Sequence, residues 1–202
     1  MRFHHLLLPA LLASTGLFAA GAIAADGPPA AASTVVIMAS DGASRLTIAA
    51  GAQQVEIQAG ALHLVGETRG EKRYYHRGKG GAAVVEVKSD GDGFKLRTPD
   101  GKLAWKVKFG TDKIKVSDNE QNANAWEIKT GHTDKAKVVD GAGKDVGEVR
   151  YADKIKVKDG AGAERFVVEN GARSSAYAGL LLANVPEPER LVIVAELLAK
   201  GR

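Results

Sequence analysis

Four consecutive segments of this chain repeat one pattern of residues. The last three begin with Asp-Lys-x-Lys-Val, at Asp112, Asp134 and Asp153. Within each segment, apolar and polar residues alternate in two runs, separated by turn-forming residues such as glycine, aspartate and asparagine. A repeat of about 20 residues with alternation in both halves is typical of one β-hairpin per repeat. The sequence therefore predicts hairpins over residues 93–110, 112–131, 134–151 and 153–171.

Upstream of the repeats, the same alternation continues in a looser form. Short alternating runs are separated by glycine-containing turns such as Asp41-Gly42 and residues 78–81. Including the hairpins, the chain offers about 12 to 14 strands at the short, regular spacing that is typical of antiparallel barrels and sandwiches. The expected upstream strands are 34–39, 45–49, 53–58, 61–65, 72–76 and 82–88.

The sequence changes character near its C-terminal end. Residues 174–185 are rich in alanine and leucine, Pro186 interrupts them, and a second helical pattern covers residues 186–200. A closed sheet must fill its interior with side chains, but aromatic residues make up only 5% of this chain. A helix that is apolar on nearly every side belongs in a core.

We therefore expect a single all-β domain over residues 34–202, a closed antiparallel barrel of about 12 strands around a hydrophobic helix. The core helix is assigned to residues 174–185, with Leu181 or Leu182 among the least exposed residues. The terminal helix, residues 186–200, lies beyond this plug, so truncation at Pro186 is expected to be tolerated.

The first 25 residues have the pattern of a targeting segment. Arg2 gives a positive start, an apolar stretch covers residues 6–20, and Ala22-Ile23-Ala24 resembles a cleavage site. We expect a cleaved signal peptide over residues 1–25, a flexible lead-in over residues 26–33, and a periplasmic or secreted product. The chain has no cysteine, which excludes disulfides and a lipid anchor on cysteine.

With these hairpins and the late helix, the chain resembles the tubby C-terminal-like superfamily, which includes the LURP-one-related proteins and the phospholipid scramblases. The resemblance covers residues 34–200 and rests on units such as residues 154–160, Lys-Ile-Lys-Val-Lys-Asp-Gly. It implies a barrel of about twelve strands around one C-terminal helix, with functions centred on membrane lipid headgroups. The export signal and the second helix depart from the family's pattern. No functional residue carries over, because no motif matches.

No pattern of reactive side chains indicates catalysis. The three histidines beyond the signal segment, His63, His76 and His132, lack the spacing of metal ligands. Ser174 and Ser175 lack the glycine context of a nucleophile elbow. We therefore expect no enzymatic activity, no cofactor and no metal site.

Two glycine-rich segments resemble ligand-binding loops only in part. Residues 89–93 begin like a calcium loop, but Gly101 occupies the position at which an EF-hand needs glutamate. Residues 77–81 are basic, but they lead into a strand and not into the helix of a phosphate-binding loop. Hairpin turns are the favoured interpretation of both segments, and anion contact is the alternative for residues 77–81.

Lysine is dense at the outward positions of the repeats. If the hairpins stack in order, these lysines form a basic stripe on adjacent strands, suited to anionic lipid headgroups or another envelope polyanion. The alternative is that they only keep the protein soluble and protect strand edges from aggregation. The formal net charge of +4 does not require a nucleic acid partner, and export argues against one. The proposed anionic-surface contacts are Lys113, Lys115, Lys135, Lys137, Lys154 and Lys156.

Two functional hypotheses follow from these features. The first is an exported, non-enzymatic binding or structural protein of the bacterial envelope, which contacts anionic lipid or polysaccharide through the lysine-rich face. The second is a protein-interaction or carrier module that uses the C-terminal helix, residues 191–198, as its contact element. An enzyme is the least supported class.

Overall fold

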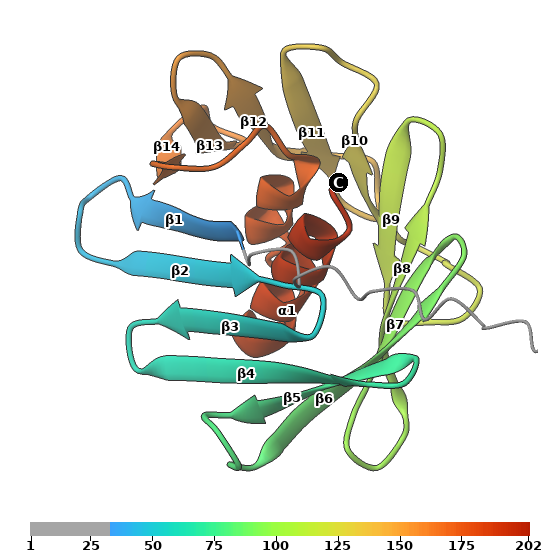
Figure 1. Cartoon of the computed structure of the whole chain (residues 1–202). Coiled ribbons are helices and arrows are strands. Elements are labelled where there is room, and N and C mark those ends of the chain that lie inside the picture. Colours follow the sequence, from blue (N-terminus) through green and yellow to red (C-terminus); the bar gives the residue numbers. More distant parts are fainter. Residues whose placement is uncertain (1–32) are drawn as a thin grey trace, which may run out of the picture.

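Fourteen antiparallel strands close into one barrel, in which sequence neighbours pair and β1 also pairs with β14 (Figure 1). The computed structural model describes residues 33–202; the expected signal peptide and all but the last residue of the lead-in lie outside the described residues. The strands are β1 (Ser33–Ala39), β2 (Arg45–Ala50), β3 (Gln54–Ala59), β4 (Leu62–Arg69), β5 (Lys72–Arg77), β6 (Ala83–Asp90), β7 (Gly93–Arg97), β8 (Leu103–Phe109), β9 (Lys113–Ser117), β10 (Trp126–Lys129), β11 (Lys135–Val139), β12 (Asp145–Tyr151), β13 (Ile155–Asp159) and β14 (Glu164–Val168).

Each predicted hairpin repeat is one pair of strands, from β7–β8 to β13–β14. Side chains alternate between the two faces of a strand, so Val107 and Val116 lie opposite each other and are buried. The Asp-Gly turns close the hairpins as expected, because the Asp159 carboxylate accepts hydrogen bonds from the backbone N–H groups of Ala161 and Ala163. The predicted all-β barrel is confirmed, with fourteen strands where the resemblance implied about twelve.

The connections alternate between the two ends of the barrel, because successive strands run in opposite directions. We call the end at which β14 leads into the helices the exit end. It also contains the turns that join β4 to β5, β8 to β9 and β12 to β13. The opposite end contains the turns within the hairpin repeats, such as residues 140–144 between β11 and β12.

Two helices fill the interior of the barrel (Figure 1). The 3-10 helix η1 (Ser175–Leu181) packs against β10–β13, and the α-helix α1 (Glu187–Ala199) packs against β2, β3 and β6. The helices also pack closely on each other, since a Cβ atom at Gly179 would lie 2.9 Å from Cγ2 of Val194. Within residues 33–202, neither helix has the length and apolar character needed to cross a membrane.

The helix predicted over residues 174–185 is shorter than expected and differs in type. It is a 3-10 helix that begins after the N-cap residue Ser174 and ends at Leu181. Its predicted burial is confirmed: Leu182 is fully buried, and only Ala183 and Asn184 are exposed between Ala176 and Val185.

The terminal helix matches its predicted bounds but not its expected place. Residues Leu191–Leu197 of α1 are all buried, so the helix belongs to the core and is not an appendage beyond it. The burial of this helix was not predicted from sequence, because Glu187, Glu189 and Arg190 make its first turn polar and lower its overall hydrophobicity. The residues that the second hypothesis assigned to partner contact are therefore largely covered by the barrel.

A buried polar cluster ties α1 to the barrel wall. Oε1 of Glu196, a residue that is only 3% exposed, accepts hydrogen bonds from Nη1 of Arg73 at 2.9 Å and from the Tyr75 hydroxyl at 2.8 Å. Nη2 of Arg73 also donates to the carbonyl oxygens of Gly51 and Ala52. Burial, followed by the negative charge of Glu196, raises the pKa of Tyr75 well above its usual value. The cluster fixes the rotation and depth of α1.

Candidate anion-binding face

The six predicted contact lysines lie on one wall of the barrel but not on adjacent strands. Lys113 and Lys115 are on β9, Lys135 and Lys137 are on β11, and Lys156 is on β13. The prediction of adjacent strands was wrong because each repeat is a hairpin, so its second strand intervenes. Lys154 is exposed and directly precedes β13.

The intervening strands bring carboxylates to these lysines. Glu127 on β10 and Glu148 on β12 lie between them and are each about four-fifths buried. The ion pairs are Lys113–Glu127 at 3.2 Å, Lys115–Glu127 at 3.6 Å, Lys135–Glu148 at 3.8 Å, Lys137–Asp145 at 3.4 Å and Lys156–Glu164 at 2.7 Å. Half-exposed pairs of this kind contribute little to stability, and they neutralise only part of the lysine charge on this wall.

The strand register places basic residues directly opposite one another, in rows that cross several strands. Lys129 on β10, for example, faces Lys113 on one side and Lys137 on the other. We call these rows ladders. Ladder one is Lys72, Lys88, Lys95 and Lys106 on β5–β8, ladder two is Lys113, Lys129 and Lys137 on β9–β11, and ladder three is Lys135, Arg150 and Lys156 on β11–β13. Together with the opposed pair Lys108–Lys115, the three ladders form the cation belt.

Direct opposition of like charges is an unfavourable arrangement in a sheet. Opposite residues have Cβ atoms about 4.5–5.5 Å apart, and like charges at that distance are destabilising. The six contacts predicted from sequence did not include the belt members Lys72, Lys88, Lys95, Lys106, Lys108, Lys129 and Arg150. Their only signal is the pairing register, which depends on the turns and bulges of every hairpin.

The barrel wall is strongly asymmetric in charge. Within residues 33–202, every lysine that lies in a strand is on β5–β13. The remaining arc, from β14 through β1 to β4, has Arg45, Arg69 and Arg165 as its basic strand residues. The cation belt is therefore a local feature and does not reflect a general surplus of lysine on the surface.

One anion of the chain itself already occupies part of ladder one. Oε2 of Glu120, in the loop between β9 and β10, lies 2.8 Å from Nζ of Lys95 and 3.7 Å from Nζ of Lys106. These two lysines are directly opposite each other in the register. The hydrogen bond from Lys95 is the main cause that lowers the pKa of Glu120, with further lowering by the charges of Lys106 and Arg97. Opposed ladder lysines can thus share one carboxylate.

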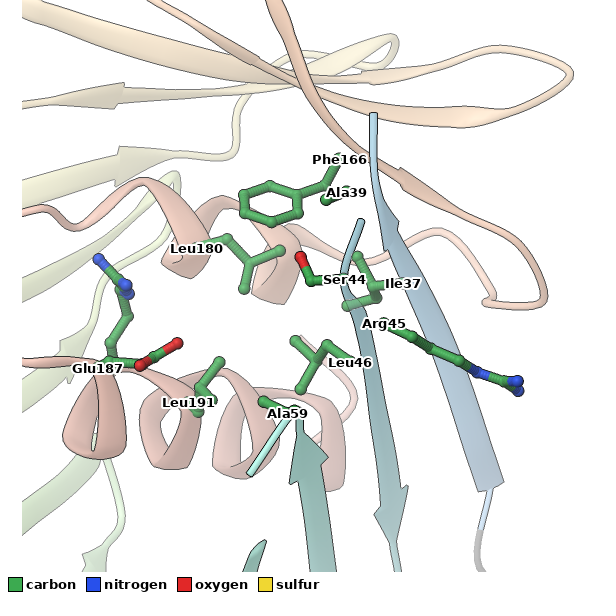
Figure 2. A pocket seen from close by; sticks show the side chains of 12 residues that line it. Ile37, Ala39, Ser44, Arg45, Leu46, Ala59, Phe166, Leu180, Glu187 and Leu191 are labelled. Atoms are coloured by element: carbon green, nitrogen blue, oxygen red, sulfur yellow. The ribbon is translucent and has the colours of Figure 1, made fainter. Parts of the chain in front are cut away.

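A separate cavity of about 190 Å³ lies at the opposite end of the barrel, between β1, β2, β14 and the two helices. Figure 2 shows Leu46, Leu180 and Leu191 directed into it, whereas the side chain of Arg45 points away. The charged lining residues, including Glu187, carry both signs, so the lining selects no charge for a ligand.

The residues considered for metal binding and catalysis do not converge. His63 contacts Glu56 through Nε2 at 2.7 Å, and Nδ1 of His76 lies 3.2 Å from the carbonyl oxygen of Gly81. In the part of the chain that the structure describes, no three histidine, aspartate or glutamate side chains are placed to hold a metal ion. The glycine-rich segments at residues 89–93 and 77–81 form the ends and turns of hairpins, which was the favoured interpretation of both.

Comparison with known proteins identifies no relative of this chain. No protein-family model matches the chain, and no curated protein or solved structure is significantly similar to it. The barrel around C-terminal helices agrees with the architecture that the tubby-like resemblance implied, but no match assigns the chain to that superfamily.

Proposed function

We propose that this protein is an exported, non-enzymatic binding protein of the bacterial envelope, which contacts anionic lipid or polysaccharide through the cation belt. The observation that carries the proposal is the direct opposition of basic residues in three ladders. An arrangement that weakens the sheet is expected to persist where it serves binding. The signal pattern of residues 1–25 supports export.

The closed barrel argues against one alternative role of the lysines. Charged residues often protect exposed strand edges from pairing with other molecules. In this barrel β1 pairs with β14, so the sheet has no free edge for lysines to protect. Solubility remains as the competing role, and it would not require lysines to face one another across strands.

The tubby-like resemblance supports the lipid form of the proposal. Functions in that superfamily centre on lipid headgroups, and the present chain shares the plan of a many-stranded barrel around C-terminal helices. Each lysine close to an anionic membrane surface contributes on the order of 1 kcal/mol at ordinary salt. A few belt lysines are then sufficient for measurable binding.

Charge reversal of ladder two is expected to weaken binding to anionic vesicles by roughly 100-fold, because three lysines at about 1 kcal/mol each are lost. The variant carries Lys113→Glu, Lys129→Glu and Lys137→Glu. Its matched control carries Lys79→Glu, Lys102→Glu and Lys144→Glu, which lie in turns at the opposite end and change the net charge equally. Co-sedimentation with phosphatidylglycerol vesicles at low salt measures both variants.

Comparison of the two variants distinguishes binding at the cation belt from binding that depends only on the net charge of the protein. Equal losses in both would show that only net charge matters and would remove the belt as the site. If the wild-type protein binds neither anionic vesicles nor an acidic polysaccharide at low salt, the proposed function is wrong.

A further inference from the structure

We infer that the ligand that engages the whole cation belt is a flexible linear polyanion, specifically an acidic polysaccharide that follows the curved wall of the barrel, because a flat bilayer can contact only part of the belt. This inference rests on the proposed function and narrows its ligand. It depends on where the ladders lie around the barrel and on which charges remain uncompensated.

The belt extends around more than half of the barrel. Its ladders begin on β5 and end on β13, which makes nine consecutive strands of the closed fourteen. In Figure 1, β5 lies at the lower edge of the barrel and β13 at the upper edge, with β7–β9 along the side between them. Outward side chains at the two ends of the belt therefore point in different directions, and one plane cannot contact all three ladders.

The spacing of the belt fits a chain that carries regularly placed charges. Neighbouring strands are about 4.8 Å apart, so the belt follows an arc of roughly 40 Å from β5 to β13. Within each ladder, consecutive strands contribute a cation, as Lys72, Lys88, Lys95 and Lys106 do. A polysaccharide with one carboxylate per sugar can place successive charges along such a path, since it bends with the wall.

Each ladder has at least one member at the exit end of the barrel. Lys72 and Lys113 are the first residues of β5 and β9, Lys135 is the first residue of β11, and Lys129 is the last residue of β10. All four positions are at the exit end. Ladder one leaves this end as it crosses to β8, because Lys106 faces Ser117, the last residue of β9. The path therefore begins at the exit end but is not confined to it.

Uncompensated charge is available along the path. Among residues 33–202, Lys129 is the one belt residue that forms no ion pair with a carboxylate, and it is exposed. The carboxylate of Glu120 between Lys95 and Lys106 shows the contact that a sugar carboxylate would make: one acid group held by two opposed lysines. Such contacts depend on charge, so binding must weaken steeply with salt.

The test uses the mature exported protein, with alginate oligomers and their monomer as probes and phosphatidylglycerol vesicles as the comparison. Two variants remove ladders on different sides of the barrel: Lys72→Gln, Lys88→Gln and Lys95→Gln for ladder one, and Lys135→Gln, Arg150→Gln and Lys156→Gln for ladder three. Titration calorimetry over a salt series gives the slope of log affinity against log salt concentration. Circular dichroism and the elution volume confirm that each variant is folded. The control variants retain the charge: lysine is replaced by arginine in ladder one, and Arg150 is replaced by lysine in ladder three.

We expect the oligomer to bind much more tightly than the monomer, and each glutamine variant to reduce the magnitude of the salt slope by about two, the value for three lost charges on a flexible single strand. The versions that retain the charge should keep the wild-type slope. Loss of binding in only one of the two ladder variants would overturn the inference, because a planar ligand such as a bilayer would contact the ladder on only one side of the barrel. Binding to vesicles without binding to alginate would also overturn it while leaving the proposed function intact. Absence of binding to either probe would overturn both.

Discussion

A chain that ends at Val185, and therefore lacks α1, is expected to be unfolded or aggregated. Helix α1 buries Leu191–Leu197 inside the barrel, and five of these seven residues are leucine, isoleucine or valine. Burial of each such side chain contributes roughly 1.5–3 kcal/mol, so their loss approaches or exceeds the ~5–15 kcal/mol stability of an ordinary domain. The far-ultraviolet circular dichroism and the elution volume of the truncated chain measure the outcome.

From sequence alone, truncation at Pro186 was expected to be tolerated, and the structure leads to the opposite expectation. The proline and the polar first turn made residues 186–200 resemble an appendage, but α1 fills the half of the barrel next to β2, β3 and β6. A chain ending at Val185 that stays soluble and monomeric, with the thermal midpoint of the full chain, would show that η1 alone suffices as the core.

Glu196→Ala is expected to destabilise the protein by about 3–5 kcal/mol. Removal of one partner from a buried ion pair leaves the other charge without compensation, and here the guanidinium of Arg73, with 11% of its side chain exposed, loses the Oε1 acceptor. The Tyr75 hydroxyl loses the same acceptor. Urea denaturation of the variant measures the change in the free energy of unfolding.

A matched control lies on the same helix. Glu187 is exposed in the first turn of α1, and its replacement by alanine is expected to cost less than about 1 kcal/mol, the contribution of an acidic residue near a helix N-terminus. Equal effects of Glu187→Ala and Glu196→Ala would mean that the Arg73–Glu196–Tyr75 cluster does not hold α1 in place.

The strands of this fold could be predicted from sequence because alternation is a local property. Two runs around an Asp-Gly turn define a hairpin wherever they occur, and the units at residues 134–151 and 153–171 were found for that reason. Burial of residues 176–182 could be predicted in the same way, from an apolar composition that no surface helix would carry.

The remaining features depend on contacts between distant residues. Arg73 and Glu196 are 123 positions apart, and in the sequence each resembles an ordinary charged surface residue. The ladders depend on the register of eight successive strand pairs, including irregularities such as the shift at Val138 and Val139, so no single segment reveals that Lys129 faces both Lys113 and Lys137. The sequence located the lysine-rich wall but not the rows within it.

The stability and the anion affinity of Lys129→Gln, measured on the same sample, test the central claim most directly. Lys129 faces two lysines, and removal of two unfavourable pairs at roughly 0.2–1 kcal/mol each should raise the thermal midpoint by a few degrees. The same change should lower the affinity for the anionic probe that the wild type binds by about 5-fold, and Lys79→Gln should alter neither quantity. A Lys129→Gln protein that is more stable and binds the probe as tightly as the wild type would contradict the account, because the opposed lysines would then weaken the sheet without serving binding.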